Sequence, residues 1–325
     1  MRPIPATLLA AACLLTVLAC AKQTEIRTPV GATVTPTAQW DLPWSTAFKS
    51  PQALAVGADG AAWVAYAASG RLLRFNAAGA VTADWGPLGT APGRFDDPAG
   101  LAVSPVGEVY VVDRFANRIV RFSAAGAVLD AWGSRGSSAG ALDAPVGVAV
   151  GPDGTVYVAD AGNHRVQYFT PTGAYLGEWR SEAIAAGRQF AAPVGVAVAS
   201  DGTVYVADEG NHRVLHLASD GAFIRNLGTR GGAGGQFEAP GGVAVAPDGT
   251  VVVADTGNHR VQRFDPAGRF LGSFGERGGA LGDFRSLEAV AVAPDGSIFS
   301  ADAAIHRVDR FAGDGTPLPA WGTAP

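Results

Sequence analysis

The chain has 325 residues and a formal net charge of −5, and 48% of its residues are hydrophobic. This mild negative charge, without any basic run, excludes the uniform positive potential that nucleic-acid binding requires. Both cysteines, Cys13 and Cys20, lie within the first twenty residues, so the remainder of the chain has no disulfide and no cysteine metal site.

Residues 1–20 have the pattern of a secretory signal peptide. Arg2 supplies a short positive end, and residues 6–19 form an apolar stretch too short to span a membrane comfortably. Residues 17–20, Val-Leu-Ala-Cys, resemble the cleavage box of a bacterial lipoprotein signal. The resemblance implies cleavage before Cys20 and lipidation of its sulfur. Ordinary cleavage after Ala21 is the alternative, because residues 19–21 also fit a small-x-small site.

Residues 21–38 are polar, rich in Thr and Pro, and poor in large apolar side chains. Such a segment cannot bury enough surface to fold alone, so it is interpreted as a flexible linker. Together, these two segments predict a lipoprotein of the bacterial cell envelope that faces the periplasm or the exterior. The lipid anchor would be its only membrane contact, and the choice between inner and outer membrane stays open.

Residues 39–325 are predicted to form one domain of six repeats. The stretch 145–179 reads PVGVAVGPDGTVYVADAGNHRVQYFTPTGAYLGEW, which is four short apolar runs separated by the turn signals PDG, GNH and PTG. A period of 47 or 48 residues with four strands predicts an all-β fold, a six-bladed β-propeller of four-stranded antiparallel blades. The repeats start at Pro51, Pro98, Pro145, Pro193, Pro240 and Leu287. The innermost strands are expected near 53–56, 100–103, 147–150, 195–198, 242–245 and 289–292.

Two segments compete for the strand that closes the ring. Gln39 and Trp40 resemble the end of a fourth strand, as residues 84–85, 131–132 and 178–179 do. The last repeat has a fourth strand of its own near 318–321. Closure protects edge strands from pairing with other chains, but the sequence does not say which segment provides it.

The second and third strands carry a specific motif. The strings VADAGNHRV (158–166), VADEGNHRV (206–214) and VADTGNHRV (253–261) resemble the NHL repeat, named for an Asn-His-Leu run, with Arg in place of Leu. The resemblance extends over residues 51–322 and implies an NHL-type propeller. The resemblance says little about function, since NHL propellers include interaction modules, receptor sensor domains and a few lyases.

One Asp and one Arg recur in almost every repeat, and both are expected to stabilise the blade. The Asp can accept hydrogen bonds from amides of the turn that follows it, and the Arg can pair with that Asp or reach the next blade. Repeat one departs at the Asp position, where it has Tyr66, and keeps Arg71 at the Arg position. The other positions are Asp113, Asp160, Asp208, Asp255 and Asp302, with Arg118, Arg165, Arg213, Arg260 and Arg307.

Histidine is the remaining candidate for metal chemistry. Four histidines occupy equivalent turns, where neighbouring blades should hold them more than ~10 Å apart, too far to share one ion. These are His164, His212, His259 and His306, and the fifth, His216, is assigned to packing or surface. Peptide-amidating lyases with this fold bind zinc through histidines near the axis, and no innermost strand here has one. We therefore expect no metal, no cofactor and no catalytic residue among the repeated positions.

The loops that precede each repeat start, called lead-in loops below, vary most in charge and are expected to converge on the axis. Exposed loops on a rigid scaffold are where recognition usually resides, and mixed charges suit a protein or glycan partner. We therefore expect a monomeric, extracytoplasmic binding or scaffolding module. The alternative is a propeller enzyme, a lyase or hydrolase that uses the axial pocket. The candidate binding residues are Arg94, Asp96, Asp97, Asp143, Glu238 and Arg285.

Overall fold

The computed structural model of the protein describes residues 49–86, 89, 93–180 and 189–318. The predicted signal peptide, with Cys20, the linker 21–38 and the candidate closing strand at Trp40 lie outside the described residues. Within those ranges, no helix has the length and apolar character needed to cross a bilayer.

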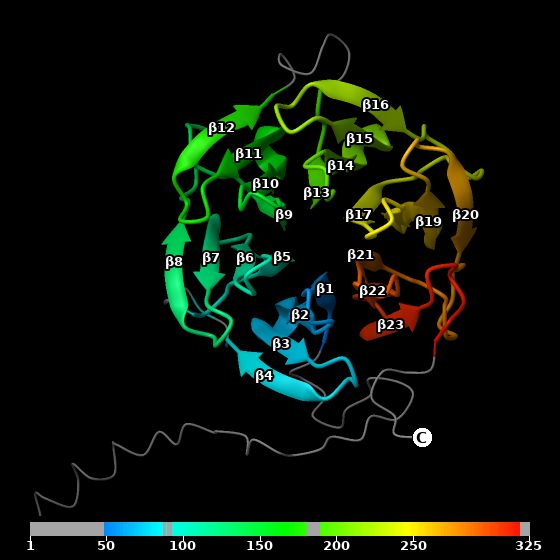
Figure 1. Cartoon of the computed structure of the whole chain (residues 1–325), viewed down its shortest axis with the longest axis horizontal. Coiled ribbons are helices and arrows are strands. Elements are labelled where there is room, and N and C mark those ends of the chain that lie inside the picture. Colours follow the sequence, from blue (N-terminus) through cyan, green and yellow to red (C-terminus); the bar gives the residue numbers. More distant parts are fainter. Residues whose placement is uncertain (1–48, 87–88, 90–92, 181–188, 319–325) are drawn as a thin grey trace, which may run out of the picture. The chain divides into compact units, whose positions relative to one another are not determined.

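Six antiparallel sheets surround a central axis, as the sequence predicts (Figure 1). Each sheet is one blade, and its strands follow chain order from the axis outward. The innermost strands are β1 (Pro51–Val56), β5 (Pro98–Val103), β9 (Pro145–Val150), β13 (Pro193–Val198), β17 (Pro240–Val245) and β21 (Leu287–Val292). The second strands are β2 (Ala62–Tyr66), β6 (Val109–Asp113), β10 (Val156–Asp160), β14 (Val204–Asp208), β18 (Val251–Asp255) and β22 (Ile298–Asp302).

The third strand of every blade and the outermost strand of blades one to five are also five residues long. The third strands are β3 (Arg71–Phe75), β7 (Arg118–Phe122), β11 (Arg165–Phe169), β15 (Arg213–Leu217), β19 (Arg260–Phe264) and β23 (Arg307–Phe311). The outermost strands are β4 (Val81–Trp85), β8 (Val128–Trp132), β12 (Tyr175–Trp179), β16 (Phe223–Leu227) and β20 (Phe270–Phe274). Short 3₁₀ turns follow four second strands: η1 (Ala67–Ser69), η2 (Ala161–Asn163), η3 (Glu209–Asn211) and η4 (Thr256–Asn258).

The sixth blade has three strands within the described residues, and its fourth position is occupied by the C-terminal segment. Pro317 forms an antiparallel bridge with Phe311, and the Leu318 amide donates to the Arg310 carbonyl at 2.9 Å. In blade one, Val81 pairs with Phe75 in the same register. Pro317 and Leu318 therefore lie where the outermost strand begins in the other blades.

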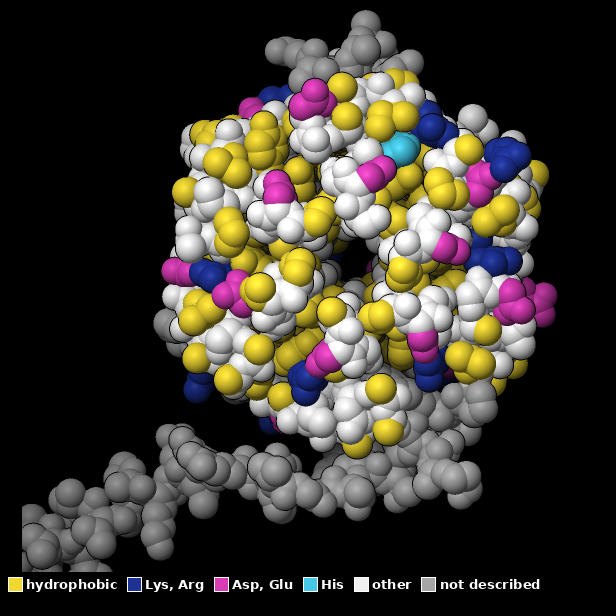
Figure 2. Space-filling model, viewed as in Figure 1, with side chains coloured by type: hydrophobic (Ala, Val, Ile, Leu, Met, Phe, Trp, Pro, Cys, Tyr) yellow, Lys and Arg dark blue, Asp and Glu magenta, His cyan; other side chains and the backbone are white. Residues whose placement is uncertain are grey.

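The hydrophobic core consists of six clusters, each between two neighbouring blades. The second strands are buried along their whole length because both faces of each blade are covered. One cluster joins blade six to blade one, where Phe299 packs with Leu54 and Phe75. The Ser50 amide also donates to Nδ1 of His306 at 3.1 Å. These contacts close the ring, whose central hollow is visible in Figure 2.

Candidate functional site

A cavity of about 340 Å³ lies on the axis of the ring. Residues from the innermost strands of all six blades line it, together with Arg114, Glu209 and Thr256 from turns that follow second strands. This cavity is called the axial pocket. The face of the propeller that carries these turns and the lead-in loops is called the mouth face, because alternating strand direction places both at the same end of the blades.

A β-bulge at the start of each innermost strand positions the side chains of the pocket. In blade one the pairing register skips Gln52 between Pro51 and Ala53. In blade six it skips Glu288 between Leu287 and Ala289. Bulges redirect a side chain away from the regular alternation of the strand, and here they accompany side chains that line the pocket.

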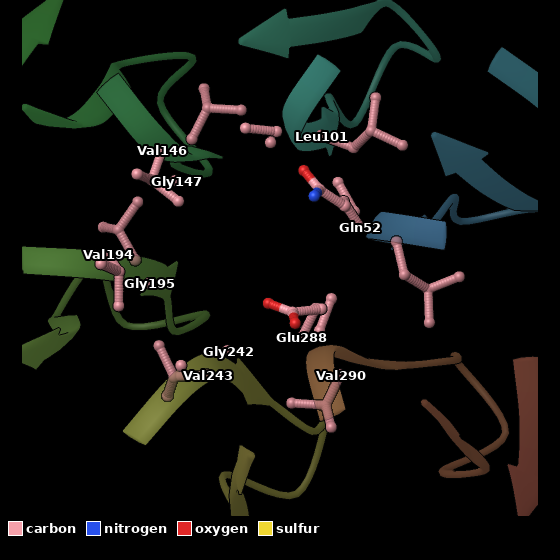
Figure 3. Close-up of a pocket in the computed structure, with 18 of the residues that line it drawn as sticks. Gln52, Leu101, Val146, Gly147, Val194, Gly195, Gly242, Val243, Glu288 and Val290 are labelled. Carbon is pink, nitrogen blue, oxygen red and sulfur yellow. The ribbon is translucent and has the colours of Figure 1, made fainter. Parts of the chain in front are cut away.

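Only two of the six bulges hold polar side chains. Gln52 and Glu288 come from adjacent blades, and both extend their polar ends into the pocket (Figure 3). Ser286 Oγ lies 2.5 Å from Oε1 of Glu288 and donates to it, which fixes the carboxylate. The bulges of the four other blades hold small or aliphatic residues, namely Ala99, Val146, Val194 and Gly241.

The turns after the second strands supply the other polar groups. Arg114, Glu209 and Thr256 occupy the first position of this turn in blades two, four and five. The hydroxyl of Thr256 donates its hydrogen to the Leu287 carbonyl at 2.7 Å, so the oxygen faces the pocket as an acceptor. The remaining three blades have alanine at this position.

Arg114 is held by a buried carboxylate. Its Nε donates to Oδ2 of Asp97 at 2.6 Å, and Asp97 is only 4% exposed. The guanidinium also lies over the ring of Phe115, 5.3 Å from its centroid. Phe115 is 65% exposed, which makes it a large apolar side chain beside the rim of the pocket.

Glu209 is a half-buried carboxyl that lines the axial pocket. Burial raises the pKa of its carboxyl, the charge of Glu288 raises it further, and His212 acts in the opposite direction. Glu209 and Glu288 line the pocket from blades four and six. No hydrogen bond or ion pair joins the Glu209 side chain to any of the described residues.

The six lead-in residues named from the sequence are not among the residues that line the axial pocket. Asp97 is not a surface group, because it is buried against Arg114. Glu238 pairs with Arg230 at 3.1 Å, and Asp143 lies 3.6 Å from Arg135. Arg94, Asp96 and Arg285 are exposed.

The repeated Asp joins its turn to the lead-in loop of the same blade. In blade six Asp302 also accepts the amides of Ala304 and Ile305 in the following turn, at 3.0 and 3.2 Å, which is the bonding expected from the sequence. Oδ1 of Asp160 accepts the Asp143 amide at 2.7 Å, and equivalent bonds occur in blades two, four, five and six. Four of the Arg residues pair with this Asp: Arg118, Arg165, Arg213 and Arg260. In blade six Arg307 pairs with Asp309 instead of Asp302, and in blade one Arg71 pairs with Asp84.

The four turn histidines have left-handed backbones, with φ between 53° and 56°. Two of them link successive blades, since Nδ1 of His212 accepts the Ala239 amide and Nδ1 of His306 accepts that of Ser50, both at 3.1 Å. His216 stacks on Tyr205 with ring centroids 4.1 Å apart, and burial lowers its pKa. Among the described residues, no group of three or more His, Cys, Asp or Glu side chains could hold a metal ion.

The candidate binding residues chosen from the sequence included none of the five polar residues that meet in the pocket. The available signal was the repeat alignment, in which Gln52 and Glu288 stand against small or aliphatic residues. Arg114, Glu209 and Thr256 likewise stand against alanines. That signal marks unusual positions, but only the bulges and the closed ring show that they face one cavity.

Comparison with known proteins supports this architecture. The family model of the NHL repeat matches residues 142–169, 190–217 and 237–264, in blades three to five. The chain is therefore a six-bladed β-propeller with NHL repeats. No curated protein matches the sequence significantly.

Several solved structures share the fold. A streptogramin B lyase is 16% identical with a TM-score of 0.61, and the match covers 86% of this chain and 85% of the other. A virginiamycin B lyase from Staphylococcus aureus, solved with quinupristin, is also 16% identical with a TM-score of 0.61, over 87% of each chain. A gluconolactonase from Xanthomonas campestris is 16% identical with a TM-score of 0.55, over 82% of each. At this level of identity, the similarity shows the fold alone.

Proposed function

We propose that this protein is an exported, lipid-anchored binding module that recognises a protein or glycan partner with its mouth face. The observation that carries the proposal is the axial pocket, where five polar side chains that the repeats do not share meet on one face. Residues shared by all blades serve the scaffold, so selectivity has to reside in residues that are not shared. A concave site with a few convergent polar groups is the usual form of a ligand site.

The rim of the pocket supports recognition of a large partner. Phe115 is exposed on a turn whose neighbour, Arg114, is anchored by Asp97, so the ring is presented from a fixed backbone. Exposed Arg94, Asp96 and Arg285 lie on lead-in loops of the same face. This mixture of an aromatic ring and charges of both signs suits a protein or a polar glycan better than nucleic acid.

The face that binds a partner can be mapped with matched variants. We expect Phe115→Ala combined with Arg285→Glu to abolish or strongly weaken capture of a partner from solubilised envelope membranes, because both side chains are exposed on the mouth face. Val106→Arg is the control, since Val106 is 77% exposed on the hairpin at the opposite end of blade two. Quantitative mass spectrometry of cross-linked complexes provides the measurement. Loss of the partner with Val106→Arg alone would assign binding to the opposite face.

A second candidate function is catalysis in the axial pocket, as a lyase or hydrolase. The specific observation in its favour is Glu209, a carboxyl that lines the pocket without a hydrogen-bond partner among the described residues and whose pKa is raised by burial. Turnover of a lactone or cyclic depsipeptide panel that is lost in Glu209→Gln would support this candidate over a binding role.

The membrane anchor is tested at Cys20. We expect the parent protein to fractionate with membranes and to carry diacylglycerol and acyl chains by intact-mass measurement. Cys20→Ala should move the protein to the soluble extracytoplasmic fraction. The signal peptide is removed by cleavage, and residues 21–38 contain no apolar segment that could serve as another anchor. An unmodified mature chain beginning at Lys22 would instead indicate ordinary cleavage after Ala21.

A further inference from the structure

The charges that face the axial pocket do not balance. Its ionisable lining residues are Arg114, Glu209 and Glu288. The positive charge of Arg114 is already compensated by the buried Asp97 at 2.6 Å. Neither Glu209 nor Glu288 forms an ion pair with any described residue, so the pocket retains two uncompensated carboxylates.

Several acceptors of the pocket are free to receive a hydrogen bond. The hydrogen of the Thr256 hydroxyl is used by the Leu287 carbonyl, which leaves only acceptor capacity toward the pocket. One oxygen of Glu288 is engaged by Ser286, and the carboxylate of Glu209 has no donor among the described residues. The Gln52 amide, which extends into the cavity in Figure 3, offers both a carbonyl acceptor and an NH₂ donor, and Arg114 is a further donor. A cationic group with several donors is the complement of the two carboxylates and the Thr256 oxygen.

The opposite wall of the pocket is apolar. Val146, Val194 and Val243 line it from blades three, four and five, and all three carry branched aliphatic side chains. This surface suits a short alkyl chain. An apolar wall also lowers the local dielectric constant, which strengthens the interaction of a charge with the carboxylates.

We propose that the axial pocket binds a primary alkylammonium group, with the ammonium on Glu209 and Glu288 and its alkyl chain along the valine wall. An ammonium offers a positive charge and three donors, which match the two carboxylates and the Thr256 oxygen. The inference rests on the proposed binding function and deepens it, because it assigns a ligand chemistry to the mouth face. The same group occurs on a lysine side chain and on a free diamine, and the experiment below separates these two sources.

Binding is tested by isothermal titration calorimetry on the intact chain in detergent. The probes are n-butylamine, putrescine and acetyl-lysine-methylamide, with n-butanol and acetate as neutral and anionic counterparts. We expect saturable binding of the amines and none of the counterparts. Tighter binding of acetyl-lysine-methylamide than of putrescine identifies a protein lysine as the natural source, and the reverse order identifies a free diamine.

Matched variants show where the amine binds. Glu209→Gln and Glu288→Gln should each weaken amine binding at least tenfold, and the double variant should abolish it. Glu276→Gln makes the same charge change at an exposed loop position outside the pocket and should bind as the parent does. Glu209→Gln should not lower the melting temperature, because the Glu209 side chain has no hydrogen bond to a described residue. Glu288→Gln should not lower it either, because the glutamine carbonyl can still accept from Ser286. Amine binding should also weaken as the pH falls through the raised pKa of Glu209, since the protonated carboxyl no longer attracts the cation.

The outcomes separate this inference from the proposed function. Equal amine affinity in the parent and the double variant, absence of amine binding, or preferential binding of acetate would each overturn the inference. The mouth face could still capture its partner in those cases, because that result depends on Phe115 and Arg285. Loss of partner capture with intact amine binding would overturn the proposed function and leave the amine site standing.

Discussion

Replacing Asp160 with alanine is expected to lower the free energy of unfolding by about 3–5 kcal/mol, the range for breaking a buried ion pair by removing one partner. Asp160 and Arg165 are both fully buried, with Nε of Arg165 2.7 Å from Oδ2 of Asp160. The same carboxylate accepts from Asn163 and Gln167 and from the Asp143 amide. Its removal therefore leaves several buried donors without a partner.

The equivalent pair in blade four provides the matched comparison. Arg213 is 12% exposed, and Oδ2 of Asp208 lies 3.1 Å from it. Asp208→Ala should therefore cost less, about 1–3 kcal/mol, because water can reach the freed guanidinium. Urea denaturation of both variants measures the difference. If Asp160→Ala cost no more than Asp208→Ala, burial of the arginine would not be what makes the pair important.

The second large effect is expected at Gly100, where substitution by alanine should destabilise the protein by about 1–3 kcal/mol, the usual cost of overpacking. Gly100 lies on innermost strand β5, and a Cβ there would overlap the backbone carbonyl of Val146 on β9. It would also approach Cγ2 of Val112 to 2.9 Å. A backbone carbonyl cannot rotate away as a side chain can, so blades two and three would have to separate.

Gly232 provides the control for this substitution. A Cβ at Gly232 would have only Oδ1 of Asn258 nearby, at 3.7 Å, and the residue does not have a positive φ. Gly232→Ala should therefore change the melting temperature little or raise it slightly through reduced backbone entropy in the unfolded chain. Equal losses of stability in both variants would indicate that the backbone preference of glycine over alanine, and not the close approach of neighbouring blades, explains the cost of the substitution.

The sequence by itself determined the blades. The 47-residue period, the four apolar runs and the turn residues between them are local signals, because strand and turn formation depend on neighbouring residues. The innermost strands begin two residues earlier than expected, at Pro51 in blade one, because pairing continues beyond the bulge: Gln52 is skipped and Pro51 still pairs with Tyr66. The choice between the two closing segments was not local, and the pairing of Pro317 with Phe311 shows the C-terminal segment in the outer position of blade six.

Only the tertiary structure decided which residues form the site. Gln52 and Glu288 lie in the first and the last repeat. They come from adjacent blades because the ring closes through the packing of blade six on blade one. Asp97 looks like an exposed loop carboxylate in the sequence, yet it is buried against Arg114. Side-chain direction at a bulge and the pairing of Arg114 with Asp97 depend on how strands and loops meet in three dimensions. The pattern of apolar and turn residues in the sequence does not encode these contacts.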